Sequence, residues 1–280
     1  MQRITTATEI SKISKDCRDK GLKIGFVPTM GALHNGHLSL ITRAKSENDV
    51  VICSIFVNPT QFNESSDFER YPRTLEKDAE MLNSVGCDYL FAPDSAEIYP
   101  VPDRTTYELG GVAEFLEGEH RPGHFNGVAS VVKRLFEIVK PHKAYFGLKD
   151  YQQYLVIKKL EEKYQLGVDV IGCPIIRSQD GLAMSSRNRL LEEHEAKHAL
   201  VLNKSLSEAR KNIEKGKSPE EVEMEIKEEL ITKGVDLEYF EIRNAGDLSI
   251  PSSSQEPLVA LVAARFGKVR LIDNMNLRGD

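Results

Sequence analysis

The stretch at residues 26–40, FVPTMGALHNGHLSL, decides the fold because a strand pattern gives way to a helix pattern inside it. An apolar strand pattern ends at Pro28, and Leu38 and Ile41 then resume at helical spacing. Residues 34–37 are therefore predicted to lie in the first turn of a helix. Unpaired backbone N–H groups and the positive end of the helix dipole favour a phosphate at that place. We expect a nucleoside triphosphate to bind there.

Two histidines give this stretch its chemistry. His34 and His37 are three residues apart and share one helical face, so both imidazoles can reach one phosphate or stabilise its charge in a transition state. The alternatives are a zinc pair or ordinary surface histidines. Zinc requires further nitrogen, sulfur or carboxylate ligands, and no such grouping is visible around this stretch. The phosphate interpretation is favoured.

Length and composition describe an ordinary globular chain of about two domains. The 280 residues include 29% charged and 40% hydrophobic side chains. The net charge of −6 excludes a general attraction to nucleic acid or anionic membranes. No apolar run approaches the roughly 18 residues of a membrane span, and the N-terminus lacks a signal-peptide core. We expect a cytoplasmic protein with no nucleic-acid or membrane partner, whose four widely spaced cysteines are buried reduced thiols.

Strand and helix patterns alternate through the first 175 residues, which indicates βαβ units and a parallel sheet. The expected strands are at residues 23–27, 50–57, 89–91, 105–109, 143–147 and 168–173. The expected helices are at about residues 6–19, 34–48, 74–85 and 128–140, with one more that opens at residue 148. From residue 190 the pattern changes to helices at 190–215 and 218–233 and strands at 237–243, 258–266 and 268–273.

The predicted fold class is α/β. A Rossmann-like parallel sheet with helices on both faces forms a domain at residues 1–175, which contains the expected nucleotide site. A smaller α+β domain with an antiparallel sheet follows at residues 176–280. It lacks further phosphate signals, and we expect it to cover the nucleotide site.

Two amide side chains follow the strand at residues 50–57. Asn58 and Gln61 stand at the carboxyl end of that strand, where ligands bind in open α/β sheets. Amides both donate and accept, which suits the hydroxyl and carboxylate groups of a small polar substrate. The competing interpretation is a simple Asn-Pro turn, and from these residues alone the turn is favoured.

A second polar cluster follows the strand at residues 143–147. Lys149 opens the next helix at the same sheet edge as the histidines and can neutralise triphosphate charge. Asp150 can bind a ribose hydroxyl or orient a cation, and Gln153 can contact a second substrate. The alternative for any single lysine is a solvated surface charge.

A third cluster, Ser185, Ser186 and Arg187, joins two hydroxyls to a guanidinium, which makes a compact phosphate clamp. An Asp-Gly turn before a helix cap is the competing interpretation, and it is favoured from the residues alone.

Four separated motifs, taken together, favour the binding roles over the turn and surface-charge alternatives given above. VPTMGALHNGH, FVNPTQF, FGLKDYQQ and AMSSR occur in this order, and they resemble the pantothenate synthetase family of the HxGH nucleotidyl-transferase superfamily. AMSSR resembles the KMSKS-type loop that partners HxGH, although Ser186 and Arg187 replace the residues of the tRNA synthetases. The resemblance implies condensation of (R)-pantoate with β-alanine through a pantoyl-adenylate, with ATP consumed and AMP and pyrophosphate released. It also implies Mg²⁺ as a cofactor and a homodimer.

The same resemblance implies roles for individual residues. His34, His37 and Lys149 are the expected catalytic residues. Gln61 and Gln153 are expected to bind pantoate, with Gln61 also contacting β-alanine and Asn58 beside it. The expected ATP-binding residues are Met30, Gly31, Ala32, Leu33, His34, Asn35, Gly36, His37, Gly147, Leu148, Lys149, Asp150, Ile176, Met184, Ser185, Ser186 and Arg187. No protein metal ligand is assigned.

Three segments receive no firm role. Residues 63–77 are polar and indicate a long loop, of a kind that can form a lid over a reaction shielded from water. Residues 117–128 indicate a Gly-rich surface loop. Asp78 suits a solvated helix face as well as the assistance to magnesium that the resemblance suggests, and it is left unassigned.

Two rival functions remain open from the sequence. One is a different nucleotidyl transferase, such as a cytidylyl- or phosphopantetheine adenylyl-transferase, which acts on a phosphate; the amides of Asn58 and Gln61 favour a carboxylate substrate instead. The other is a non-catalytic nucleotide-sensing module, which would bind ATP without needing Ser185 or Arg187.

Overall fold

The computed structural model describes residues 1–63 and 65–278, and the chain divides into two compact units. The first unit contains residues 1–148 and 153–174, and the second contains residues 149–152 and 175–280. That the second unit covers a nucleotide site stays a prediction.

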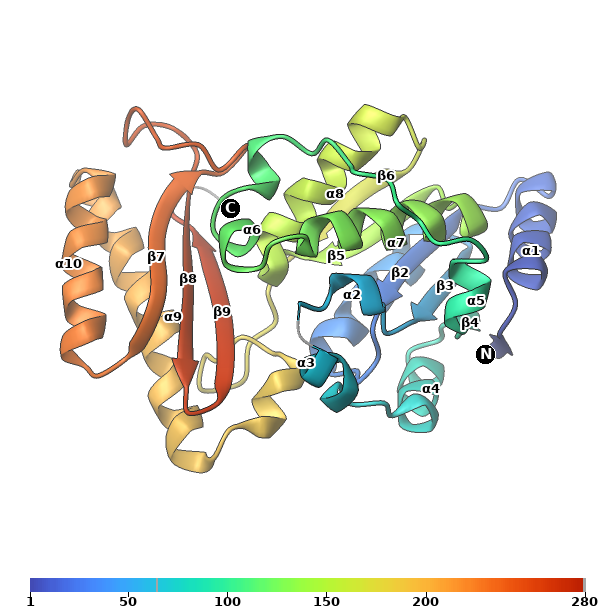
Figure 1. Ribbon diagram of the computed structural model, residues 1–280, viewed down its shortest axis with the longest axis horizontal. Coiled ribbons are helices and arrows are strands. Elements are labelled where there is room, and N and C mark those ends of the chain that lie inside the picture. Colours follow the sequence, from blue (N-terminus) through green and yellow to red (C-terminus); the bar gives the residue numbers. More distant parts are fainter. Residues whose placement is uncertain (64, 279–280) are drawn as a thin grey trace. The chain divides into compact units, whose positions relative to one another are not determined.

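The first unit is built on a six-stranded parallel sheet with helices around it, as predicted (Figure 1). Its order is β1-β4-β3-β2-β5-β6. The strands are β1 Gln2–Ile4, β2 Ile24–Thr29, β3 Val50–Ile55, β4 Tyr89–Phe91, β5 Lys143–Gly147 and β6 Asp169–Cys173. The α-helices of this part of the chain are α1 Ala7–Asp19, α2 Asn35–Glu47, α3 Ser65–Arg70, α4 Leu75–Ser84, α5 Ser95–Ile98, α6 Glu117–His120, α7 His124–Val139 and α8 Tyr151–Tyr164.

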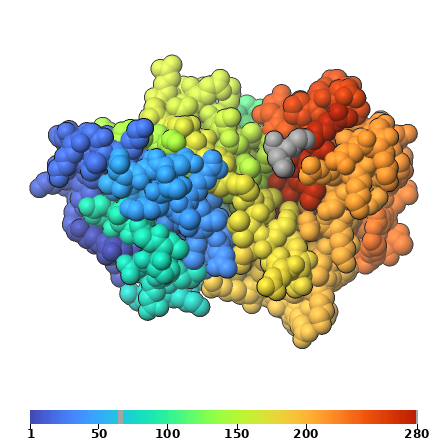
Figure 2. Space-filling view, turned by 180° about the vertical axis from the view of Figure 1, so that it is seen from behind, coloured from blue at the N-terminus to red at the C-terminus, as the bar shows by residue number. Residues whose placement is uncertain are grey.

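The strand order reverses between β2 and β5. From β2 the chain moves outward to β3 and β4, and later returns to place β5 on the other side of β2. Ligands of open α/β sheets bind at such a reversal, beyond the carboxyl ends of the strands. The segments that follow Thr29 and Gly147 therefore leave the sheet at the place where a ligand is expected. The light-blue part of the chain, in which α2 lies, reaches the surface on the face that Figure 2 shows from behind.

Burial explains why β2 and β3 are predicted well. Val50, Val51, Ile52 and Cys53 in β3 are all buried, as expected for a strand covered on both faces of a parallel sheet. β1 is absent from the predicted strands because only Ile4 of its three residues is buried, and it pairs with β4 through its backbone. Two polar residues and one apolar residue carry no strand pattern.

Three predicted segments require correction. Residues 105–109 form no strand, because side chains satisfy this backbone: Asn126 Oδ1 accepts from Tyr107 N at 2.8 Å and Asp103 Oδ1 accepts from Thr105 N at 2.9 Å. The expected loop at 63–77, of which residue 64 lies outside the described residues, is interrupted by the short helix α3 and by the start of α4. Residues 117–128 are largely helical, because α6 and α7 begin there despite the glycines.

The second unit has the predicted antiparallel sheet and two helices. The strands, in spatial order, are β7 Asp236–Asn244, β8 Leu258–Phe266 and β9 Val269–Asn276. The helices α9 Glu193–Glu214 and α10 Pro219–Thr232 lie against this sheet, as Figure 1 shows. Ser218 and Glu221 form a capping box that starts α10. Apolar residues of both helices and all three strands share one core, including Leu202, Ile226, Phe240 and Val262.

Two properties of the described residues bear on the chemistry. None of their helices is both long and apolar enough to span a membrane. The four cysteines are free and buried, and burial raises the pKa of the Cys87 thiol to about 12. A buried thiol that stays protonated is a poor nucleophile.

Candidate active site

The predicted helix start at the two histidines is confirmed, but the histidines cap the helix themselves. His34 is the N-cap of α2, and its Nδ1 accepts a hydrogen bond from Gly36 N at 3.1 Å. His37 Nδ1 accepts from His34 N at 3.3 Å. The two side chains thus form a reciprocal capping box. The expectation of unpaired N–H groups is therefore wrong for residues 34 and 36.

This capping fixes the tautomers of both rings. A backbone N–H group only donates, so the Nδ1 atom that it meets must carry a lone pair. The neutral forms of His34 and His37 then hold their protons on Nε2. The ring centroids lie 4.1 Å apart, so two N–H donors stand close together at the start of α2. Paired donors of this kind suit phosphate oxygens.

The turn between β2 and α2 is held by a buried carboxylate. Asp78, in the first turn of α4, is 1% exposed. Its oxygens accept from Ala32 N at 2.9 Å and Leu33 N at 2.8 Å, and Thr74 Oγ1 adds contacts at 3.1 and 3.2 Å. Gly31 and Ala32 both have positive φ, +81° and +50°. The carboxylate thereby stabilises a turn that is unfavourable for an L-residue.

The other end of α2 is anchored to β5 and β6. Arg43 Nη1 donates to Gly172 O at 2.9 Å, and Arg43 Nε donates to Glu47 Oε1 at 2.9 Å. Glu47 Oε2 also accepts from Lys143 Nζ and Tyr145 OH, each at 3.0 Å. The Arg43 guanidinium, together with Lys143, lowers the pKa of the Glu47 carboxyl to about 2. Both ends of the histidine-bearing helix are thus fixed to the sheet unit.

The two predicted substrate amides contact each other. Asn58 caps the 3₁₀ helix η1 Pro59–Gln61 and Gln61 is its last residue; the two are 1% and 7% exposed. Asn58 Nδ2 donates to Gln61 Oε1 and to Gly127 O, both at 3.1 Å. Gln61 Nε2 lies 3.2 Å from Met30 Sδ. Residues after β2 and after β3 therefore meet, as the parallel sheet predicts.

Residues 121–127 support the same turn. His124 Nδ1 lies 2.9 Å from Gln61 O, and Arg121 Nη1 lies 3.1 Å from His124 Nε2. Because the carbonyl only accepts and the guanidinium only donates, His124 holds its proton on Nδ1. A Cβ on Gly127 would lie 2.3 Å from Thr60 O, so only glycine fits there. This gives the segment, which had no predicted role, a structural one.

The Lys149 cluster has contacts within the second unit. β5 ends at Gly147 and the 3₁₀ helix η3 Leu148–Asp150 leads into α8, close to the prediction. The Lys149 side chain is 18% exposed, and its Nζ lies 3.9 Å from Asp150 Oδ1. Lys149 O accepts from Asn274 Nδ2 at 2.8 Å. Gln153 lies in α8 and is partly buried.

The clamp residues lie on and after a hairpin of the second unit. Met184 N donates to Ile176 O at 2.9 Å, which brings together two predicted ATP-binding residues. Ser185 Oγ then accepts from Arg187 N at 3.3 Å and caps the 3₁₀ helix η4 Ser186–Leu190. Arg177, next to Ile176, anchors the hairpin to β9 through a bidentate ion pair with Asp273.

The ion pair of this hairpin is largely buried. Arg177 Nη1 donates to Asp273 Oδ2 at 2.6 Å and Nη2 donates to Oδ1 at 2.9 Å. The same guanidinium reaches Gly181 O and Asn274 O at 3.2 and 3.3 Å. Asp273 is 4% exposed. The position of the clamp residues therefore depends on this pair.

Three supporting residues are absent from the predicted site: Asp78, His124 and Tyr99. An acidic residue in a first helical turn is common for the helix dipole, and nothing in the sequence marks Asp78 as buried. His124 lies in a glycine-rich segment that indicates a surface loop. Tyr99 contacts Asn58 from 41 positions away in sequence. Only the fold brings these side chains to the site.

Comparisons with known proteins agree with one another. A family model described as pantoate-beta-alanine ligase matches residues 2–276. The pantothenate synthetase of Thermodesulfovibrio yellowstonii is 46% identical over 277 residues, which cover 98% of this chain and 99% of that one. The crystal structure of pantothenate synthetase from Thermus thermophilus has a TM-score of 0.92 and 40% identity, with all of both chains covered.

A further solved structure carries ligands. The pantoate-beta-alanine ligase of Francisella tularensis, in complex with beta-gamma ATP and beta-alanine, has a TM-score of 0.79 and 39% identity over 100% of this chain and 99% of that chain.

Proposed function

Since the chain belongs to the pantoate-beta-alanine ligase family, we propose that it condenses pantoate with β-alanine at the expense of ATP through a pantoyl-adenylate. The activity is that of a ligase of pantothenate biosynthesis. A carboxylate does not react with an amine at neutral pH until it is activated, and a mixed anhydride with AMP supplies that activation. The observation that carries the proposal is the self-capped pair His34 and His37, whose Nε2–H groups stand together at the carboxyl edge of β2.

In the first step, the pantoate carboxylate attacks the α-phosphorus of ATP in line and pyrophosphate leaves. Charge spreads over the phosphate oxygens in the transition state, and positioned donors stabilise it. We assign this role to His34 and His37 of the first unit. Lys149 and the clamp residues Ser185, Ser186 and Arg187 of the second unit are assigned to the same phosphates. The other expected nucleotide contacts are Met30, Gly31, Ala32, Leu33, Asn35, Gly36, Gly147, Leu148, Asp150, Ile176 and Met184.

The proposed contact of the nucleotide with Ala32 and Leu33 cannot use the backbone N–H groups of these residues, because Asp78 accepts from both. Gln61 and Gln153 are proposed to hold pantoate by its hydroxyl and carboxylate oxygens.

In the second step, the amine of β-alanine attacks the carbonyl carbon of the adenylate, the C–N bond forms, and AMP leaves. The Nε2–H of His37 can donate a hydrogen bond to the leaving phosphate but keeps its proton, because Nδ1 accepts from His34 N and loss of Nε2–H would leave an anionic ring. The proton that the amine loses as the amide forms passes to the leaving phosphate or to solvent. Lys149 can remain paired with phosphate oxygens throughout. No covalent enzyme intermediate is required, which agrees with the buried free cysteines.

The nucleotide is proposed to enter with Mg²⁺ on its phosphates. No group of three or more His, Cys, Asp and Glu side chains among residues 1–63 and 65–278 is arranged to hold a metal ion. Magnesium commonly keeps several of its waters and binds phosphate oxygens with only one or two carboxylates from the protein, so it does not require a cluster of protein ligands. The Asp150 carboxylate, 51% exposed, is the side chain beside Lys149 that could add a ligand.

Two further expectations come from the family alone. We propose a cytoplasmic enzyme and a homodimer. Sedimentation of the purified protein tests the second: a species of twice the mass of the 280-residue chain is expected.

Pantoate-dependent exchange of radioactive pyrophosphate into ATP tests the proposed function. We expect exchange without β-alanine, because the first step is complete before the amine is needed. A phosphate-acting transferase would show no pantoate dependence, and a nucleotide-binding module would show no exchange. Gln61→Ala should raise the pantoate KM with the ATP KM preserved; the opposite pattern would contradict the assignment of Gln61.

A further inference from the structure

The Asn58 side chain is completely occupied by protein groups. Its Oδ1 accepts from Thr60 N at 3.3 Å, from Thr60 Oγ1 at 3.0 Å and from Tyr99 OH at 3.2 Å. Its Nδ2 donates to Gly127 O and to Gln61 Oε1. A backbone N–H only donates and a backbone carbonyl only accepts, so the orientation of this amide is fixed. Asn58 therefore acts on Gln61 and is not itself placed to bind substrate, contrary to the role expected from the sequence.

The orientation of Asn58 determines the polarity of Gln61. Because Gln61 Oε1 accepts from Asn58, Gln61 Nε2 must turn to the other side, where it lies 3.2 Å from Met30 Sδ. A thioether sulfur is a weak acceptor. A stronger acceptor on a ligand can therefore displace it and take the N–H bond.

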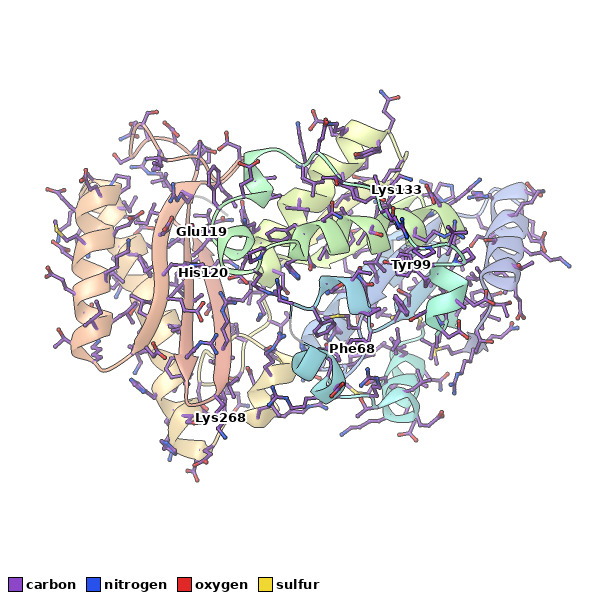
Figure 3. The ribbon with its side chains drawn as sticks, viewed as in Figure 1. Phe68, Tyr99, Glu119, His120, Lys133 and Lys268 are labelled. Atoms are coloured by element: carbon purple, nitrogen blue, oxygen red, sulfur yellow. The ribbon has the colours of Figure 1, made fainter. Side chains whose placement is uncertain are left out.

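Tyr99 is the remote member of this network. It follows α5 and lies beside α7, where Figure 3 labels it. Ser130 Oγ is 3.5 Å from the Tyr99 hydroxyl but only 2.6 Å from Asp103 Oδ2. The single hydroxyl proton of Ser130 is used in its hydrogen bond to Asp103. The hydroxyl of Tyr99 therefore donates its own proton to Asn58 Oδ1. Asp103 also accepts from Tyr107 OH at 2.8 Å.

We propose that Tyr99 is a positioning residue that, through Asn58, holds Gln61 with its N–H group toward the substrate. This inference rests on the proposed function and deepens it. A site that offers an N–H group selects a hydroxyl, ether or carboxylate oxygen and rejects an ammonium group, which has donors only. Gln61 is then matched to the oxygen atoms of the acid substrate and not to the amine of β-alanine.

Tyr99→Phe tests the proposal in steady-state kinetics that follow the release of pyrophosphate. Loss of one neutral hydrogen bond should raise the pantoate KM by about two- to ten-fold, while the ATP KM and the thermal midpoint stay near their original values. Tyr107→Phe is the matched control, because it removes a hydroxyl bound to Asp103 that does not contact Asn58. Its pantoate KM should change less than that of Tyr99→Phe does. Equal effects of the two changes would overturn the proposal.

A double-mutant cycle separates positioning from simple packing. In a Gln61→Ala background, Tyr99→Phe should no longer raise the pantoate KM, because the group that it positions is gone. Additive effects would overturn the proposal. If Tyr99→Phe does not fold, Thr60→Val removes another hydroxyl donor to Asn58 and should raise the pantoate KM in the same direction; an unchanged KM would then decide against the network. Absence of pantoate-dependent activity in the unmodified enzyme would refute the proposed function instead.

Discussion

Asp78→Asn should both destabilise the protein and slow it, because one buried carboxylate holds the turn that leads to the histidines. The substitution replaces one oxygen with an NH₂ group that then faces Ala32 N–H or Leu33 N–H. A hydrogen bond to a charged group contributes about 1.5–3 kcal/mol, and a buried unsatisfied donor costs about 1–3 kcal/mol. We expect the free energy of unfolding to fall by about 2–4 kcal/mol, allowing for partial relaxation.

The kinetic effect of Asp78→Asn follows from displacement of α2. A shift of about 1 Å in a catalytic group can cost on the order of 100-fold in rate. We expect kcat for pyrophosphate release to fall by about 10- to 100-fold, measured below the unfolding transition. Glu76→Gln is the matched control: it lies in the same first turn of α4, but its side chain is 83% exposed. It should change neither stability nor rate appreciably.

The dependence on Mg²⁺ decides between this account and a metal-ligand role for Asp78. If Asp78 only positions the turn, the Mg²⁺ concentration that gives half-maximal rate should be unchanged in Asp78→Asn. A variant of normal stability whose rate is restored by excess Mg²⁺ would refute the reasoning.

The remaining predictions concern the phosphate donors and the anchors of the site. His37→Ala should raise the barrier of adenylate formation by about 2.7–4 kcal/mol, as for the loss of an oxyanion donor, and near-normal turnover would remove its role. Because the pKa of Glu47 is lowered from 4.5 to about 2, its stabilisation is present above about pH 4.5 and is lost as pH falls through about 2. In Glu47→Gln, the free energy of unfolding should fall by about 1 kcal/mol less across that pH window than in the unmodified protein, a small value because Glu47 is partly exposed. Identical pH dependence of the two proteins would contradict this. Arg177→Leu leaves Asp273 buried without its partner and should lower the stability of the second unit by about 3–5 kcal/mol and raise the ATP KM, as calorimetry and kinetics can check; an unchanged melting profile would contradict the anchoring role.

Sequence patterns predict the parts of this fold that repeat a simple period. The continuous apolar run of β3 and the alternation of strands with helices lead directly to a parallel sheet, and the helix start at His34 follows from the same reading. Residues 105–109 are mispredicted because Asn126 and Asp103 supply the hydrogen bonds that a neighbouring strand would otherwise provide. A tertiary contact of this kind leaves no local signal.

The chemical groups of the candidate site are visible in the sequence, but the atoms that orient them are not. Spacing places His34 and His37 on one face, yet it does not show that each ring caps the helix and so fixes its tautomer. Likewise, Asn58 is expected beside a substrate, whereas its saturated hydrogen bonds make it a support for Gln61. The distinction depends on Tyr99 and Gly127, which only the folded chain brings near.

Residues 149–152 belong to the second unit although residues of the first unit precede and follow them, so no single cut in the chain separates the two units. Tyr151 OH donates to Ala245 O at 2.8 Å, and Asn274 Nδ2 donates to Lys149 O at 2.8 Å. A piece that starts at residue 176 would lack both of these partners, while a piece that ends at 175 would keep four residues whose contacts it had lost. A chimaera of two relatives that is joined at residue 175 would therefore pair residues 149–152 of one protein with Ala245 and Asn274 of the other.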